Sequence, residues 1–339
     1  MKCVSIKGVK EFEIKEIDKP VSNGEDVIID VIKTGICGSD LHYWVLGMPE
    51  GLVMGHEFCG KVVDPGSRSD LSVGDIVTGL PISPCGVCEA CLSGNPQYCP
   101  HTWENAVGLS LTYTGGLAPT LAIRPDMVMK ISDNMKPEEG AMVEPTAVGL
   151  HAIHLADIKV GDKVLVIGGG IIGLVSAMFA KLEGASSITV SETNPLRGEK
   201  SVSLGVSDYF VNPAIEGGMD KLKSIGGFDV VIECVGNAKA VNSAIDLVKP
   251  GGTIVLVGVS MLPIEVNSLS VVMKELTVLG AIGYTKGEFA TCIDLMANKQ
   301  IDVLKFVDDV VPLEGVQGAY ERVTSGNDSA VKILVDPNL

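Results

Sequence analysis

The alternation of strand-length apolar runs and helix-length segments after Thr146 constrains the fold most. KVLVIG at 163–168 has the length of a buried strand, and 172–184 has the length of a helix that ends at a glycine. The runs SITVSE, FDVVIECVG and TIVLVGV repeat the pattern with helical segments between them. Strands joined in this way pair in parallel, so the region predicts an α/β fold with a doubly wound parallel sheet.

A glycine-rich turn follows the first of these strands and opens its helix. Gly168 permits the tight turn, Gly170 lets the backbone approach a pyrophosphate, and Gly173 lets helix and strand pack closely. The free N–H groups at the helix start attract phosphates, so Ile171 and Ile172 belong to the predicted cofactor site. A strand, turn and helix without a ligand is the alternative, but the context on both sides favours a dinucleotide site.

An acidic residue at the end of the second strand indicates which dinucleotide binds. Glu192 lies 19 residues after Gly173. Its carboxylate can bind both ribose hydroxyls of NAD and would repel the 2′-phosphate of NADP. NAD is therefore predicted over NADP, although the nearby Arg197, also included among the cofactor-binding candidates, complicates this preference.

The rest of the chain has a different character. Residues 1–145 contain short strand-like runs, such as VIIDVIKTG and FCGKVVDPG, separated by Gly, Pro, Asn and Asp. After residue 285 come a helical stretch, the run VDDVVPL, another helix and the strand AVKILVD. We expect a β-rich domain formed by residues 1–145 and 286–339, and a nucleotide-binding domain formed by 146–285.

Charge and hydropathy exclude several kinds of partner. The net charge of −16 would repel a polyanionic backbone, so nucleic acid is not expected to bind. No run reaches about 18 uninterrupted apolar residues, so no membrane span is expected. The first residues, MKCVSIKGVKEFEIKE, lack the apolar core of a signal peptide. These features predict a cytoplasmic protein.

Four of the nine cysteines fall within fifteen residues, as Cys85, Cys88, Cys91 and Cys99. An odd number of cysteines without an export signal argues against a disulfide framework. Four thiolates can close a tetrahedral shell around zinc without leaving a position for water, which predicts a structural zinc site over residues 85–99. An iron–sulfur cluster is an alternative, because the spacing Cys-x2-Cys-x2-Cys also occurs in such sites and proline follows Cys99, although the gap of seven residues before Cys99 favours zinc. Two disulfides are the other alternative.

A second group of candidate ligands begins in the stretch TGICGSDLHYW, which contains Cys37. His56 and Glu57 follow in MGHEF, and Glu144 follows in MVEPTAVGLHA. Thiolate, imidazole and carboxylate together favour zinc, and three protein ligands leave one position open. Such a metal is a Lewis acid that lowers the pKa of a bound hydroxyl, which predicts transfer of hydride from an alcohol to a nicotinamide.

The alcohol proton needs an acceptor as well. Ser39, two residues after Cys37, can accept it, and His42 can pass it to solvent because an unperturbed pKa of about 6.5 suits a relay. Together with Glu57, these two residues are the predicted catalytic side chains.

Each candidate has a structural alternative. Cys37 can be buried packing, His56 a turn histidine, and Glu144 a helix cap. Ser39 can be a turn residue and His42 a surface residue. Their joint occurrence with the cysteine group and the glycine-rich turn favours the chemical interpretation. The remaining histidines are interpreted as structural: His101, His151 and His154.

The motifs together resemble the zinc-containing medium-chain alcohol dehydrogenases over nearly the whole chain. GICGSDLH, GHEFCG, VGDIVTG, the four-cysteine segment, EPTAVGLHA, VLVIGGGIIGL, DVVIECVG and GGTIVLVG carry the resemblance in the family's order. CGSDLH and the glutamate of VEP are more similar to the polyol, butanediol and threonine dehydrogenase branch than to the ethanol branch, which has cysteine at Glu144.

The resemblance implies a GroES-like β-rich catalytic domain, a Rossmann doubly wound domain and a homodimer or homotetramer. It also implies two zinc ions per subunit, one structural and one catalytic. The catalytic ion would be held by Cys37, His56 and Glu57 with water, or with Glu144, since the carboxylate that binds can vary.

The chain departs from this pattern at one place. Only 19 positions separate Cys37 from His56, so the segment YWVLGMPEGLVM is shorter than is usual for the family. Shortening this segment should change the substrate pocket, so the resemblance does not identify the substrate. Four further side chains are candidates for lining the pocket: Tyr43, Trp44, Glu104 and Tyr113.

The leading hypothesis is a zinc-dependent, NAD-dependent oxidoreductase that acts on a small-molecule secondary alcohol or the corresponding ketone. A polyol, vicinal diol or amino alcohol is the expected substrate. One alternative is a zinc-free quinone or enone reductase of the same superfamily, which predicts no ligand set. The other is a non-catalytic nucleotide-binding protein, which predicts damage to the ligands or to the proton relay.

Overall fold

The computed structural model describes all residues from 1 to 339, which form two compact units. The first unit contains Met1–Ala147, Tyr284–Ser325 and Lys332–Leu339, and the second contains Val148–Gly283 and Gly326–Val331. The short segment 326–331 thus groups with the second unit, whereas the sequence assigned it to the β-rich domain. None of the helices combines the length and the apolar character needed to cross a lipid bilayer.

A seven-stranded sheet forms the centre of the first unit. Its strand order is β14-β15-β3-β4-β5-β7, and β6 pairs with the first half of β3. A separate hairpin joins β1 to β2. The strands are β1 (Lys2–Gly8), β2 (Glu11–Glu16), β3 (Val27–Gly35), β4 (Glu57–Asp64), β5 (Ile76–Gly79), β6 (Thr120–Ile123), β7 (Val128–Lys130), β14 (Val307–Val311) and β15 (Lys332–Val335).

Short helices surround this sheet, and most of them begin at a proline or a polar residue. The helices are α1 (Asp40–Leu46), α2 (Glu89–Leu92), α3 (Pro137–Ala141), α4 (Val143–Ala156), α10 (Lys286–Ala297) and α11 (Val316–Thr324), with 3₁₀ turns η1 (Pro96–Tyr98), η2 (Pro125–Met127), η3 (Leu304–Phe306) and η4 (Leu313–Gly315). α4 continues into the second unit.

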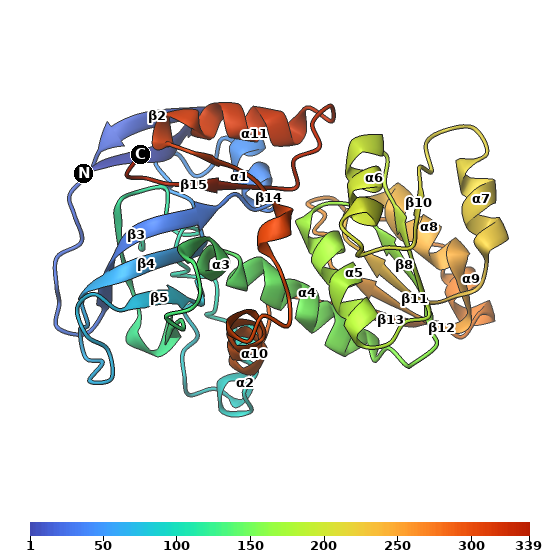
Figure 1. Ribbon diagram of the computed structural model, residues 1–339, viewed down its shortest axis with the longest axis horizontal. Helices are drawn as coiled ribbons and strands as arrows, with labels where there is room; N and C mark the ends of the chain where they lie inside the picture. The colour runs from blue at the N-terminus through green and yellow to red at the C-terminus, as the bar shows by residue number, and fades with distance from the viewer. The chain divides into compact units, whose positions relative to one another are not determined.

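The pairing of β3 with β4 places the first candidate ligands. β3 is rich in β-branched residues, and Val27, Ile29 and Val31 are fully buried. Gly35, the last residue of β3, lies opposite Glu57, the first residue of β4. The residues just after β3 and just before β4 therefore meet at one edge of the pair. Figure 1 shows the red C-terminal strand β15 beside the blue strand β3.

The second unit is a six-stranded sheet in which every neighbouring pair is parallel, in the order β10-β9-β8-β11-β12-β13. Its strands are β8 (Lys163–Ile167), β9 (Ser187–Ser191), β10 (Tyr209–Val211), β11 (Phe228–Glu233), β12 (Val248–Leu256) and β13 (Thr277–Gly280). Its helices are α5 (Ile171–Leu182), α6 (Pro195–Ser203), α7 (Gly218–Ile225), α8 (Ala238–Leu247) and α9 (Ser268–Met273). The sheet confirms the predicted Rossmann fold, since crossover helices join parallel strands.

Candidate active site

Three candidate ligands meet at the edge of the β3–β4 pair. Cys37 lies between β3 and α1, His56 directly precedes β4, and Glu57 is the first residue of β4. One donor atom of each side chain lies within 4.8 Å of the others. His56 and Glu57 are buried and Cys37 is partly exposed. The structure thus brings together a sulfur, a ring nitrogen and a carboxylate oxygen at the adjacent ends of two strands.

Asp40 is a member of this site that the sequence analysis missed. Its Oδ1 lies 3.2 Å from His56 Nδ1, and its Oδ2 accepts the N–H of Cys37 at 3.3 Å and the hydroxyl of Tyr320 at 3.3 Å. A carboxylate on one ring nitrogen orients the other nitrogen toward a metal. The motif CGSDLH contained a clue to this role, because its aspartate, Asp40, lies between Ser39 and His42, the two residues assigned to the relay.

The electrostatics of the cluster fit a cation. Burial lowers the pKa of His56, but the negative charges of Asp40 and Cys37 outweigh burial and raise the pKa well above its usual value. The potential that favours a proton on this imidazole also favours a divalent metal ion. The donor set and its charge therefore fit zinc, whose ligands in open sites include cysteine, histidine and glutamate.

Glu57 is held from one side only. Its Oε2 accepts an ion-paired hydrogen bond from Lys332, and both side chains are fully buried. Its Oε1 is buried and has no hydrogen-bond partner in the protein. A buried carboxylate oxygen without a partner is costly, and a bound cation would satisfy it.

Glu144 lies outside the group of three donors. It is in the first turn of α4, and its Oε1 accepts the hydroxyl of Tyr284 at 3.0 Å. Burial and, to a smaller extent, the charge of Glu57 raise the pKa of Glu144 to about 7, although His56, Tyr284 and Lys332 act against the rise. Its role as a zinc ligand stays a prediction.

The two predicted relay residues follow Cys37 in the chain, and Ser39 contacts its sulfur. Ser39 Oγ donates to the Cys37 sulfur at 3.2 Å, and Ser39 is the residue before α1. His42 is in α1 and is partly exposed. The segment predicted to be a shortened loop therefore begins as a helix, which ends at Gly47 with a left-handed backbone.

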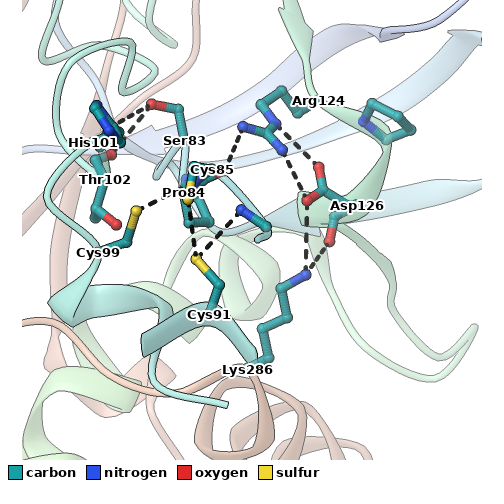
Figure 2. Close-up of polar contacts among 12 residues, drawn as sticks. Ser83, Pro84, Cys85, Cys91, Cys99, His101, Thr102, Arg124, Asp126 and Lys286 are labelled. Carbon is teal, nitrogen blue, oxygen red and sulfur yellow. Dashed lines mark hydrogen bonds and ion pairs between the residues drawn. The ribbon is translucent and has the colours of Figure 1, made fainter. Parts of the chain in front are cut away.

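The four-cysteine segment forms the second candidate metal centre, which we call the lobe (residues 85–99). Donor atoms of all four cysteines lie within 4.8 Å of one another, and none of the nine cysteines forms a disulfide. Figure 2 shows the N–H of Cys85 directed at the Cys99 sulfur, at 3.3 Å, and Arg124 bound to the carbonyl oxygen of Pro84, at 2.7 Å. The two-disulfide alternative is therefore not realised.

Backbone N–H groups donate hydrogen bonds to two sulfurs of the lobe. The Cys91 sulfur accepts the N–H of Gly86 at 3.3 Å. Desolvation raises the pKa of the Cys99 thiol, but hydrogen bonds from Cys85, His101 and Cys91 outweigh it and lower the pKa to about 6. Desolvation raises the pKa of the Cys91 thiol to about 11, so the hydrogen bonds favour a thiolate at Cys99 in particular. The four sulfurs together fit the closed shell of a structural zinc site.

The glycine-rich turn in the second unit fits a phosphate group. Gly168 has a φ of +106°, and a Cβ at Gly173 would overlap the carbonyl oxygen of Gly168. A Cβ at Gly170 would meet no atom within 4 Å, and no side chain caps the N–H groups of Ile171 and Ile172 at the start of α5. Open space before uncapped N–H groups is the arrangement that binds a pyrophosphate.

Glu192 follows β9 and is held beside this turn. Its Oε2 accepts the N–H of Gly169 at 2.6 Å, and its Oε1 accepts the N–H of Asn194 at 2.7 Å. Arg197 is in α6, which begins three residues after Glu192. The structure thus places the acidic residue next to the glycine-rich turn, and the cofactor-binding roles of Glu192 and Arg197 stay predictions.

Most of the candidate lining residues have partners of their own. Trp44 is 2% exposed and packs against Tyr320 at 5.7 Å between ring centroids. Glu104 pairs with His101 at 3.0 Å beside the lobe, and the Tyr113 hydroxyl donates to Asp26 at 3.3 Å. Trp44 is therefore a packing residue.

Two histidines that were interpreted as structural lie in α4. His151 is buried within this helix, and His154 is exposed on it.

Known proteins with similar sequences share both units. Residues 23–133 match the alcohol dehydrogenase GroES-like domain, and residues 172–298 match the zinc-binding dehydrogenase family. A sorbitol dehydrogenase from Bacillus subtilis is 32% identical to this chain, and the match covers 100% of this chain and 98% of the sorbitol dehydrogenase. A probable D-xylulose reductase A from Aspergillus clavatus is 31% identical, and the match covers 95% of this chain and 93% of the reductase.

Solved structures give the same result. The 2R,3R-butanediol dehydrogenase from Bacillus subtilis superposes with a TM-score of 0.86 at 30% identity and covers 99% of each chain. A zinc-binding dehydrogenase from Sinorhizobium meliloti bound to NADP has a TM-score of 0.87 at 30% identity, with 99% coverage of each chain. The chain belongs to the zinc-binding dehydrogenase family with a GroES-like alcohol dehydrogenase domain.

Proposed function

We propose that this chain is an NAD-dependent oxidoreductase that exchanges hydride with the carbinol carbon of a secondary alcohol. The observation that carries the proposal is the cluster of Cys37, His56 and Glu57, which offers one sulfur, one ring nitrogen and one unpartnered carboxylate oxygen. Three protein ligands leave one position for a substrate oxygen, as in catalytic zinc sites.

Each residue of the site has a chemical task. Zinc at the cluster supplies Lewis acidity, which makes an alcohol hydroxyl easier to deprotonate. Ser39 accepts the hydroxyl proton, and His42 passes it to solvent. Asp40 fixes the ring of His56, and Glu144 is a second carboxylate that can serve as a ligand. The lobe holds a structural zinc ion through its four cysteines.

The cofactor binds in the second unit, where NAD supplies the hydride acceptor. Gly168, Gly170 and Gly173, with the N–H groups of Ile171 and Ile172, bind the pyrophosphate. The carboxylate of Glu192 binds the adenosine ribose and disfavours NADP, and Arg197 in α6 is a further candidate for cofactor binding. Glu192→Ala is expected to weaken NAD binding and to narrow the preference for NAD over NADP. An unchanged Kd for both cofactors would remove this role.

The substrate class is a polyol, a vicinal diol or an amino alcohol. The names of the relatives include sorbitol, D-xylulose and butanediol, which supports hydroxyl-rich substrates. The test is NADH formation from NAD with a panel of polyols, vicinal diols, amino alcohols and simple alcohols. A clear preference within the first three groups is expected. Equal use of simple alcohols, or no turnover by protein with full zinc content, would contradict the proposal.

Self-association is the proposed assembly, as a homodimer or homotetramer in the cytoplasm. Apolar side chains are exposed on α9 and next to it along the chain, and these are Met261, Leu262, Val266, Leu269, Val272 and Met273. Contiguous exposed apolar surface commonly marks a protein interface. Light scattering should therefore give two or four times the 35.5 kDa mass of the chain. A monomer at micromolar concentration would contradict this.

A further inference from the structure

Lys332, the first residue of β15, is a fully buried lysine next to the donor cluster. Its side chain and that of Glu57 both have 0% exposure. Lysine is almost never fully buried unless it is paired, because removing an ammonium from water is costly. An apolar residue would pack in this strand without that cost, since its neighbours Ile333, Leu334 and Val335 are all buried. Strand packing alone therefore does not explain the lysine.

The two hydrogen bonds of the ammonium reach one donor of the cluster, Glu57, and the residue next to another donor, Cys37. Lys332 Nζ donates to Glu57 Oε2 and, at 3.0 Å, to the carbonyl oxygen of Ile36. Ile36 directly precedes Cys37, and Glu57 directly follows His56. One charged group thus connects the ends of the two strands that carry the cluster.

The sheet makes room for this pair at Gly35. A Cβ at that position would overlap Glu57 Oε2 and would lie 3.2 Å from Lys332 Nζ. Gly35 pairs with Glu57 in β4 and with Leu334 in β15, so the ion pair is enclosed by three strands. Any larger residue at position 35 would displace the carboxylate.

The pair makes the two oxygens of Glu57 unequal. Oε2 is engaged by the ammonium, whereas the buried Oε1 has no partner in the protein. A carboxylate can bind a metal through one oxygen or through both. With Oε2 engaged, Glu57 can offer the cluster one oxygen.

We propose that Lys332 is a positioning residue that restricts Glu57 to one oxygen at the metal and so keeps a coordination position open for the substrate. The inference rests on the proposed function, because it requires a metal at the cluster.

Cobalt(II) substitution tests the role directly. Cobalt gives a visible absorption whose intensity falls when coordination increases from four to five ligands. In Lys332→Met, both oxygens of Glu57 are free to bind. We expect the same cobalt content as in the wild type, a lower absorption per cobalt, and a fall in kcat that exceeds any change in KM.

Two controls are needed. One removes the absorption of cobalt bound at the lobe, and the other tests whether loss of any largely buried lysine changes the spectrum. Cys37→Ser protein, which retains only the lobe site, provides the spectrum to subtract. Lys33→Met is the matched variant: Lys33 lies in β3, its side chain is 12% exposed, and it pairs with Asp336 at 2.6 Å. Lys33→Met is expected to leave the difference spectrum unchanged.

An unchanged spectrum in Lys332→Met, with full cobalt content, overturns the proposal. If this variant does not fold, Gly35→Ala decides in the same way, since it keeps the ammonium and displaces Oε2 from it. A lower absorption supports the proposal and an unchanged one overturns it. If wild-type protein binds no more cobalt than Cys37→Ser does, the proposed function itself fails, which is a different result.

Discussion

The cluster of Cys37, His56 and Glu57 and the lobe are assembled by opposite means. The cluster takes its donors from the adjacent ends of β3 and β4, and it depends on Asp40 and Lys332, which come from α1 and β15. The four donors of the lobe come from fifteen consecutive residues that contain one short helix and one 3₁₀ turn.

The difference shows which of the two sites depends on the fold. The cluster is positioned by long-range contacts, so the fold exists before the metal and should survive its loss. The lobe has three partly exposed cysteines and little apolar side-chain burial of its own, so its local structure depends on the ion that its thiolates bind. Substitutions in the two sites should therefore affect different properties.

Cys37→Ser should have the largest effect. Loss of the catalytic metal removes several kcal/mol of transition-state stabilisation, so we expect turnover to fall by about 10³-fold or more. The fold should persist, because strand pairing holds the residues around it. Turnover, zinc content and the thermal unfolding midpoint measure this together. Full activity, or loss of the folded state, would contradict the comparison.

Cys88→Ser in the lobe should show the reverse pattern. One zinc ion per chain is expected to be lost, together with resistance of residues 85–99 to proteolysis, whereas the cluster keeps its metal. Cys3→Ser serves as the control, because Cys3 is a buried cysteine outside both sites. If turnover fell as far as in Cys37→Ser while the lobe stayed resistant, the two sites would not be separable in this way.

Asp40→Asn should have an intermediate effect that is confined to the cluster. The amide removes the negative charge beside His56 Nδ1 but retains the shape of the side chain. Replacing a residue that supports a zinc-binding histidine typically lowers metal affinity or activity by about 10–100-fold. Competition with a chelator measures the affinity. Equal affinity in wild type and variant would show that the imidazole needs no carboxylate support.

Arg124→Met should have the smallest effect. Arg124 donates to the carbonyl oxygen of Pro84, next to the lobe, and pairs with Asp126 at 3.1 Å. Loss of one such hydrogen bond costs about 1 kcal/mol. We expect faster proteolysis of the lobe with unchanged zinc content. Arg68→Met is the control, because Arg68 makes similar contacts with Asp70 and with the carbonyl oxygens of Pro125 and Val128.

Sequence spacing predicted the parts of the sites that are local. The glycines at 168, 170 and 173 shape a turn whose geometry depends on a few residues, and the spacing of the four cysteines alone brings the lobe sulfurs together. The parallel sheet was also predictable, because its strands and crossover helices alternate along the chain. These features could be predicted because they do not depend on contacts with residues far away in the sequence.

The supporting residues of the cluster could not be predicted in the same way. Lys332 lies 275 positions from Glu57, and Tyr320 lies 280 positions from Asp40. The pairing of β15 with β3 brings Lys332 to Glu57, whereas Tyr320 lies in α11 and packs against Trp44 of α1. A charged residue within the apolar run AVKILVD was the one available signal, and its partner depended on a strand order that periodicity does not reveal.

The interior position of β15 has a consequence for synthesis of the chain. β15 lies between β14 and β3, and it supplies the lysine that pairs with Glu57. On the ribosome, most of the second unit (148–283) emerges before β15. Domains fold as units as they emerge. The nucleotide-binding fold should therefore form first, and residues 1–147 should be the segment that chaperones protect until translation passes residue 335.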